Sequence, residues 1–177
     1  MTSASRRWLP HLLIPKLPPL TAPDRLALLL GTGFGTGFIR PLAPTWGSIP
    51  GFLYFAALLR LGSWEWGAAI TLAGIAAGVW SAGRCERLIG TKDPKPVVVD
   101  EWACAPLALW PLAFLADRPL WLWIALFCVY RIADGLKPFP ARRLEALGGG
   151  FGIMLDDEVS SSYVGALFFA AVHFRWL

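Results

Sequence analysis

Long apolar segments separated by short polar ones dominate the pattern of this chain. Residues 66–83 form the clearest of them, with 18 residues free of charge and tryptophans near both ends. This length and these flanks are typical of a helix that crosses a membrane. Four further apolar segments cover residues 46–59, 102–116, 119–130 and 159–174. The pattern therefore predicts an all-α protein, a membrane bundle of about five apolar helices.

Three parts of the pattern are less regular. Segment 46–59 has 14 uncharged residues, which is short for a full crossing, so it either spans the bilayer or only dips into it. Asp117 and Arg118 separate 102–116 from 119–130, and the pair resembles a helical hairpin with a charged tip. Four prolines interrupt WLPHLLIPKLPPL near the N-terminus. We therefore expect an irregular or interfacial arm over residues 1–25 and one helical domain over 26–177.

Composition supports a membrane protein and argues against a nucleic-acid partner. Of the 177 residues, 56% are hydrophobic and 16% are charged, and the mean hydropathy is +0.54. The net charge of +4 comes without a basic run or an RNA-binding signature, so an anionic membrane surface is the better partner. The three cysteines, Cys85, Cys104 and Cys128, are widely spaced, so we expect neither a disulfide framework nor a zinc site.

The positive-inside rule predicts which side of the membrane the loops occupy. If the loop after 66–83 is cytoplasmic, only Arg60, Arg118 and Arg175 fall outside, and all other lysines and arginines fall inside. The same topology brings acidic residues from three separate loops to the cytoplasmic side. These residues are Asp93, Asp100, Glu101, Asp134, Asp156, Asp157 and Glu158. We therefore expect these carboxylates to share a ligand at one membrane face.

Each acidic cluster stands at the end of a predicted helix. Asp100 and Glu101 begin the 102–116 segment, a flexible glycine run precedes GIMLDDEVSSS, and Arg131, Asp134 and Lys137 follow at i, i+3 and i+6. Carboxylates at helix ends also serve as caps or complement the helix dipole, so a structural role remains an alternative. Three acids in succession near a bilayer exceed what one cap needs. Carboxylate ligands without histidine suit Mg²⁺ or Mn²⁺.

The segment GTGFGTGFIRPLAPTWGS is rich in glycine but matches neither GxGxxG nor the P-loop. Its backbone amides, the hydroxyls of Thr45 and Ser48 and the guanidinium of Arg40 could cradle a phosphate at the start of the 46–59 helix. Close helix packing through small residues is the alternative. The sequence leaves both interpretations open.

The candidate chemistry is hydrolysis by an activated water. His11 and His173 lie at opposite ends of the chain, and no serine, cysteine or aspartate motif offers a covalent nucleophile. Carboxylates would hold the cation, the cation would activate water, and Lys and Arg would neutralise the developing charge. Two alternatives remain: a small membrane cation or proton transporter, which would place acids in mid-span, and a soluble helical metal-dependent phosphohydrolase with the apolar segments as its core.

Four blocks of the sequence resemble the phosphatidylglycerophosphatase A family. They are GFGTGFIRPLAPTWGS (33–48), DPKPVVVDEWA (93–103), YRIADGLKPFPARR (130–143) and GGGFGIMLDDEV (148–159), and they occur in the family's order. The resemblance implies an all-helical protein of the bacterial cytoplasmic membrane. It also implies Mg²⁺-dependent removal of the terminal phosphate from phosphatidylglycerophosphate, with the active site facing the cytoplasm.

Together, the residues and the resemblance give a set of candidate roles. The metal ligands are expected among Asp93, Asp100, Glu101, Asp156 and Asp157, and the catalytic groups are Asp100, Asp134 and Lys137. The expected substrate-binding residues are Thr45, Gly47, Ser48, Arg131, Lys137 and Arg142. The chain departs from the family pattern at Ala43-Pro44, where Pro-Gly is usual, and at Glu158 and Ser160–Ser162, which replace a mostly small apolar stretch.

Overall fold

The computed structural model describes residues 17–39, 41 and 43–174, and this part of the chain contains helices and no strand. The prediction of an all-α fold is confirmed. In chain order the elements are α3 (Ala22–Gly31), the 3₁₀ helix η2 (Thr36–Phe38), α4 (Ala43–Leu59), α5 (Trp64–Ile89), α6 (Val99–Ala103), α7 (Ala105–Leu109), the 3₁₀ helix η3 (Trp110–Phe114), α8 (Leu120–Leu136), α9 (Ala141–Leu144) and α10 (Gly149–His173). Most of the predicted arm, residues 1–16, lies outside the described residues, and α3 already begins at Ala22.

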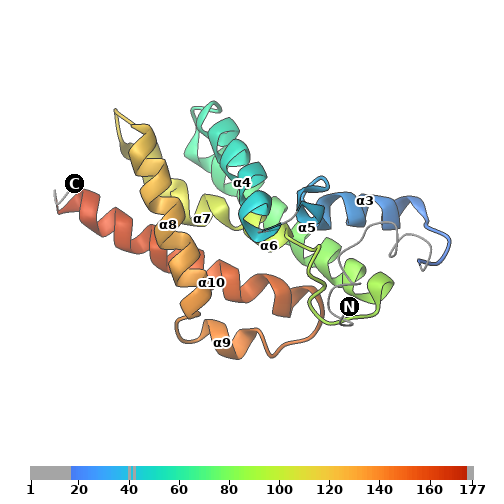
Figure 1. Ribbon diagram of the computed structural model, residues 1–177. Coiled ribbons are helices and arrows are strands. Elements are labelled where there is room, and N and C mark those ends of the chain that lie inside the picture. The colour runs from blue at the N-terminus through green and yellow to red at the C-terminus, as the bar shows by residue number, and fades with distance from the viewer. Residues whose placement is uncertain (1–16, 40, 42, 175–177) are drawn as a thin grey trace.

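Two long helices, α5 and α10, form the frame on which the other elements pack. The Ser63 side chain caps the start of α5, and Gly90, at φ 72°, ends it. Around α5 lies one buried apolar cluster, which includes Ala82, Cys85, Trp102 and Met154. A second cluster joins α4, α7, α8 and α10. Figure 1 shows α8 crossing α10, with α9 below the crossing and α3 at the other end of the molecule.

The predicted helix over 102–116 is wrong. This stretch is broken into α6, α7 and η3, because Pro106 and Pro111 lack the backbone N–H that a continuous helix needs and instead begin the next short helix. Most of the fragments are buried inside the protein, with Ala105, Ala108 and Leu112 at most 1% exposed, while Phe114 at the end of η3 is 65% exposed. Segment 102–116 is therefore part of the core, and the hairpin with 119–130 does not form as two long helices.

One described helix, α5, is long and apolar enough to cross a membrane. Its exposed side chains include Trp64, Trp66 and Leu72, which are 76%, 67% and 65% exposed. The helices α4 and α8 have 17 residues each and rise about 25 Å, somewhat less than the roughly 30 Å of a hydrocarbon core. The predicted bundle of five membrane helices is therefore not confirmed, and α5 is the candidate span among the described residues.

A polar anchor holds α3 against α5. The Thr21 amide and hydroxyl donate hydrogen bonds to Asp24 Oδ2 at 2.8 and 2.5 Å, and Arg84 Nε from α5 donates to Asp24 Oδ1 at 2.6 Å. Asp24 is therefore at once the partner of the helix cap and the link between two helices. This anchor holds α3 against the frame formed by α5 and α10.

We expect Asp24→Asn to lower the thermal midpoint at neutral pH. The Thr21 hydroxyl and amide, and then Arg84, lower the pKa of Asp24 from 3.8 to about 2. The carboxylate therefore stabilises the folded state above its unfolded pKa, and this stabilisation is lost as the pH falls through the folded value. Melting curves should show a gap between the two proteins at pH 7 that narrows as the pH approaches 2. A gap that is independent of pH would contradict this role.

Candidate active site

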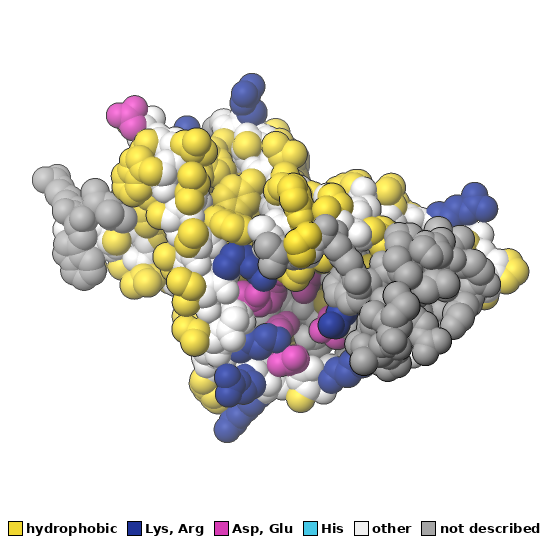
Figure 2. Space-filling model, viewed as in Figure 1, with side chains coloured by type: hydrophobic (Ala, Val, Ile, Leu, Met, Phe, Trp, Pro, Cys, Tyr) yellow, Lys and Arg dark blue, Asp and Glu magenta, His cyan; other side chains and the backbone are white. Residues whose placement is uncertain are grey.

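A cavity of about 650 Å³ opens where the loop before α6, the C-terminal end of α8 and the N-terminal half of α10 meet. Figure 2 shows Asp and Glu side chains gathered in a hollow, with Lys and Arg side chains around it and apolar side chains above it. Seven acidic and four basic side chains line the cavity: Asp93, Asp100, Glu101, Asp134, Glu145, Asp156, Asp157, Lys92, Lys95, Arg131 and Lys137. The structure thus brings the three predicted acidic clusters together in one place.

The first wall of the cavity is the segment from Asp93 to Glu101. Asp93 has φ 44°, a left-handed conformation that is uncommon for an L-residue other than glycine. The Val98 amide donates to the Gly31 carbonyl at 2.8 Å, which fixes the approach to α6. Asp100 and Glu101 then occupy the first turn of α6, as their position before an apolar segment predicts. The backbone that carries both carboxyl groups is therefore held in place by this hydrogen bond.

The second wall is α8, which supplies a tyrosine and an arginine to the same glutamate. Arg131 Nη1 forms a close ion pair with Glu101 Oε2, and it lies 3.2 Å from Asp134 Oδ2 one turn further along. The predicted shared face of Arg131 and Asp134 is confirmed. Tyr130 OH lies 3.2 Å from Glu101 Oε2 and 3.0 Å from Asp157 Oδ2. Because a phenol has one proton to donate, the two carboxylates compete for it.

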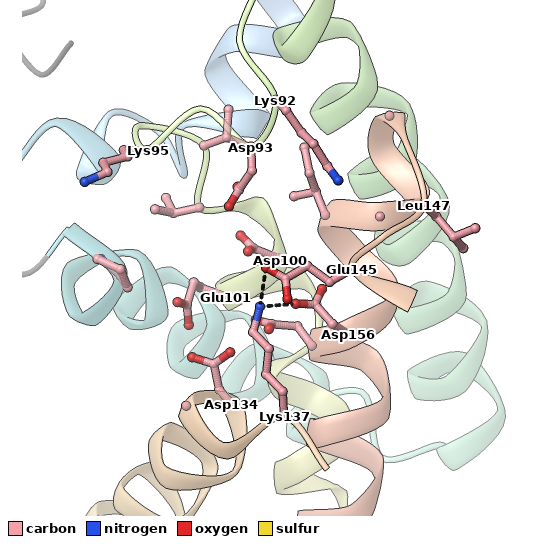
Figure 3. Close-up of a pocket in the computed structure, with 18 of the residues that line it drawn as sticks. Lys92, Asp93, Lys95, Asp100, Glu101, Asp134, Lys137, Glu145, Leu147 and Asp156 are labelled. Carbon is pink, nitrogen blue, oxygen red and sulfur yellow. Dashed lines mark hydrogen bonds and ion pairs between the residues drawn. The ribbon is translucent and has the colours of Figure 1, made fainter. Parts of the chain in front are cut away.

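Lys137 closes the cavity from the end of α8. It adopts φ 46° at the helix C-cap, and its ammonium lies 2.7 Å from Asp156 Oδ2 and 3.1 Å from Glu145 Oε1. Figure 3 shows this ammonium reaching into the group of carboxylates, between Asp156 on α10 and Glu145 on the loop after α9. Two of the three non-glycine residues with positive φ in the described chain, Asp93 and Lys137, thus line the cavity, as is common where a fold holds functional groups in place.

The cavity carries more negative charge than its own cations neutralise. Asp100 Oδ1 and Asp156 Oδ1 are buried and have no hydrogen-bond partner. Burial, and then the charges of Glu101 and Asp93, raise the pKa of Asp100 well above its usual value. Burial, and then Asp100 and Glu101, do the same for the pKa of Asp157. Burial raises the pKa of Glu101 to about 7 although Arg131 opposes the shift.

This donor set fits a hard divalent cation. Unpartnered carboxylate oxygens in an anion-rich cavity are the ligands that Mg²⁺ prefers, and Mg²⁺ uses one or two carboxylates together with water and substrate phosphate. Within residues 17–39, 41 and 43–174, no three acidic, histidine or cysteine side chains converge tightly enough to enclose an ion by themselves.

In the predicted phosphate cradle at the start of α4, the structure shows close packing at the glycine. A Cβ on Gly47 would lie 2.6 Å from Val98 Cβ, so this glycine allows α4 to approach the segment before α6. Ser48 Oγ lies 3.0 Å from the Pro44 carbonyl oxygen and 3.3 Å from Glu101 Oε2, and its one proton can be donated to either, so Ser48 contacts a cavity residue from α4. Thr45 does not line the cavity, whereas Pro44 does. Arg40 lies outside the described residues.

Several other expectations meet a different outcome. Arg142 lines a neighbouring pocket instead of the acidic cavity, and Glu158 does not line the cavity either. The glycine run before Asp156 is the first turn of α10, packed against α5, so it is not the flexible segment that its composition indicates. The sequence interpretation missed Tyr130 and Glu145. For Tyr130 a signal exists, since a tyrosine directly before Arg131 interrupts an apolar run.

Comparison with known proteins identifies the family. Residues 29–172 match the family described as phosphatidylglycerophosphatase A. Two proteins of that name, from Haemophilus influenzae and Escherichia coli, are 35% and 31% identical to this chain, covering 80% and 82% of it and 86% and 83% of their own lengths. A Bacteroides thetaiotaomicron protein named as a phosphatidylinositol-3-phosphatase is 37% identical over 88% of this chain and 97% of its own length.

No solved structure gave a significant match. The family match covers the whole cavity, from the segment before α6 to α10. The resemblance read from the four sequence blocks is therefore confirmed, and so is the prediction of a phosphatase. This chain belongs to the phosphatidylglycerophosphatase A family.

Proposed function

We propose that this protein hydrolyses the terminal phosphate monoester of phosphatidylglycerophosphate, with Mg²⁺ in the acidic cavity, and so produces phosphatidylglycerol. The observation that carries the proposal is the cavity itself, in which seven carboxylates from four separate segments surround unpartnered oxygens of Asp100 and Asp156. The family match gives the substrate class. A cation in the cavity would offset the repulsion between its carboxylates and a phosphate monoester.

Asp100 and Asp157 are the first residues that would hold the ion, with Asp93, Glu101 and Asp156 beside them. A bound divalent cation would neutralise phosphate charge and promote ionisation of the attacking water. Asp100 and Asp157 carry the strongest case, because burial and neighbouring carboxylates disfavour their charges and, among the described residues, no ion pair joins either of them to a lysine or arginine. A cation relieves that conflict directly.

The basic residues and Asp134 would handle the phosphate and the proton. Arg131 and Lys137 each face the cavity from α8 and are held by carboxylates, so they are positioned to donate to phosphate oxygens as charge develops. Asp134 lies at the rim with its side chain 17% exposed, where it can accept a proton from the attacking water. The transporter alternative places acids in mid-span. Asp100, Glu101 and Asp134 instead lie near the ends of α6 and α8, and Asp156 and Asp157 lie in the N-terminal half of α10, which is not the candidate span.

We place the cavity at the cytoplasmic face of the bacterial inner membrane. The exposed apolar side chains of α4, α5 and α8 favour contact with lipid, and Figure 2 shows Lys and Arg gathered around and below the hollow. A phospholipid could then enter from the leaflet while its headgroup reaches the carboxylates. The name of the Bacteroides relative concerns another phospholipid headgroup with a phosphate monoester, so phosphatidylinositol 3-phosphate is the second substrate to test.

Asp156→Asn and removal of metal are expected to lower phosphate release in parallel. Purified protein in nonionic detergent micelles should release phosphate from phosphatidylglycerophosphate, and a chelator should abolish this release. Asp156→Asn removes one carboxylate charge and the ion pair with Lys137, so we expect a loss of about a hundredfold. Asp117→Asn, an exposed change at the loop before α8, is the matched control. Activity that survives both chelation and Asp156→Asn would reject metal-assisted hydrolysis.

A further inference from the structure

A second pocket, of about 370 Å³, lies beside the acidic cavity and has the opposite charge. Its lining is Leu136, Lys137, Phe139, Pro140, Arg142 and Arg143, without an acidic residue. Lys137 lines both pockets, so one side chain separates them. The lysine ammonium points into the acidic cavity, where it binds Asp156 and Glu145. The charge of the second pocket therefore rests on the two arginines.

Neither arginine is committed to a carboxylate. Arg142 Nη2 donates only a long hydrogen bond, 3.4 Å, to the Leu136 carbonyl, and the Arg143 guanidinium lies 4.9 Å from the centre of the Phe139 ring. No ion pair joins either of them to an acidic group among the described residues. This differs from the acidic cavity, where Arg131 and Lys137 are both paired. Two guanidinium groups without carboxylate partners are suited to a phosphate.

We propose that this basic pocket binds the phosphodiester of the same lipid whose terminal monoester occupies the acidic cavity. The inference rests on the proposed function, because phosphatidylglycerophosphate carries two phosphate groups joined by a glycerol. The adjoining pockets, divided by Lys137, offer a place for each group. Leu136 and Phe139, 66% and 69% exposed, would face the apolar part of the lipid next to the diester. The pocket thereby selects headgroups that carry a second phosphate.

The test compares ligands with and without the diester. In nonionic detergent micelles, the double variant Arg142→Gln/Arg143→Gln should raise the KM for phosphatidylglycerophosphate about tenfold with kcat little changed. The reason is that the lost contact stabilises the bound substrate and the transition state equally. The inhibition constant of phosphatidylglycerol, which keeps only the diester, should rise by a similar factor. Hydrolysis of phosphatidate, which has only the monoester, should keep its kcat/KM. Arg60→Gln, exposed beyond the far end of α4, is the matched control.

The outcomes distinguish a failure of the diester-site proposal from a failure of the proposed phosphatase function. An unchanged inhibition constant for phosphatidylglycerol in the double variant would overturn the diester site, as would an equal loss on phosphatidate. Weaker binding of the variant to phosphatidylglycerol-containing vesicles, with kinetics in micelles unchanged, would show that the arginines bind the bilayer surface instead and would also overturn it. If wild-type protein released no phosphate from phosphatidylglycerophosphate, the proposed function itself would fail.

Discussion

Replacing Asp100 by asparagine is expected to reduce phosphate release by about a thousandfold while leaving the protein folded. Asp100 lies in the first turn of α6, and its Oδ1 atom is buried without a partner. The substitution keeps the shape of the side chain and removes the charge that a cation would need. It also removes a buried like charge beside Glu101, so the metal-free variant should melt at a higher temperature than the wild type.

A binding measurement distinguishes this role from a purely structural one. Mg²⁺ should raise the melting temperature of the wild type in detergent, because an ion that binds only the folded state stabilises it. The Asp100→Asn variant should lose most of this rise, whereas Asp117→Asn should keep it. Near wild-type turnover in Asp100→Asn would remove Asp100 from the proposed site. A lower metal-free melting temperature would contradict the view that its charge destabilises the fold.

The acidic site could be predicted because its residues stand beside apolar segments in short, distinctive blocks, although Asp156 and Asp157 lie about two turns inside α10 and not at its start. Asp100 and Glu101 follow a proline-rich loop, and Asp134 shares a helix face with Arg131 at a spacing that the sequence itself gives. Charged residues are costly near a bilayer, so those that remain beside apolar segments are informative. The positive-inside rule then predicted that these three acidic clusters lie on the same side of the membrane. The structure gathers these carboxylates in one cavity, as expected, while the five-span topology used to predict it is not confirmed.

Other features depend on packing that no local pattern encodes. Segment 102–116 has the composition of a membrane helix, yet Pro106 and Pro111 divide it and the core buries the pieces. Gly47 belongs to the predicted phosphate cradle, and in the structure Val98 packs closely against it. Arg142, four residues after Pro138, turns away into the basic pocket. The packing of Gly47 against Val98 is decided by a partner that is distant in the sequence, whereas the break in 102–116 follows from its own prolines and Arg142 shares its pocket with residues at most six positions away.

The glycine run at the start of α10 is the clearest such case, and Gly150→Ala tests it. A Cβ at this position would lie 1.8 Å from the Val79 carbonyl oxygen and 2.9 Å from the Gly83 amide nitrogen, both backbone atoms of α5. Alanine favours a helix over glycine by up to about 1 kcal/mol, which alone would stabilise the protein. Overpacking against backbone costs about 1–3 kcal/mol or more, so we expect net destabilisation and a lower melting temperature.

The same change should reach the active site through α10. Gly150 precedes Asp156 and Asp157 by less than two turns of the same helix, so forcing α10 away from α5 displaces both carboxylates. A shift of about 1 Å at reacting groups can cost about a hundredfold in rate, and we expect a loss of that order in phosphate release. Gly148→Ala is the matched control, because nothing lies within 4 Å of its added Cβ and its φ is −89°. Equal stability and activity in the two variants would show that close contact between α5 and α10 does not position the acidic residues.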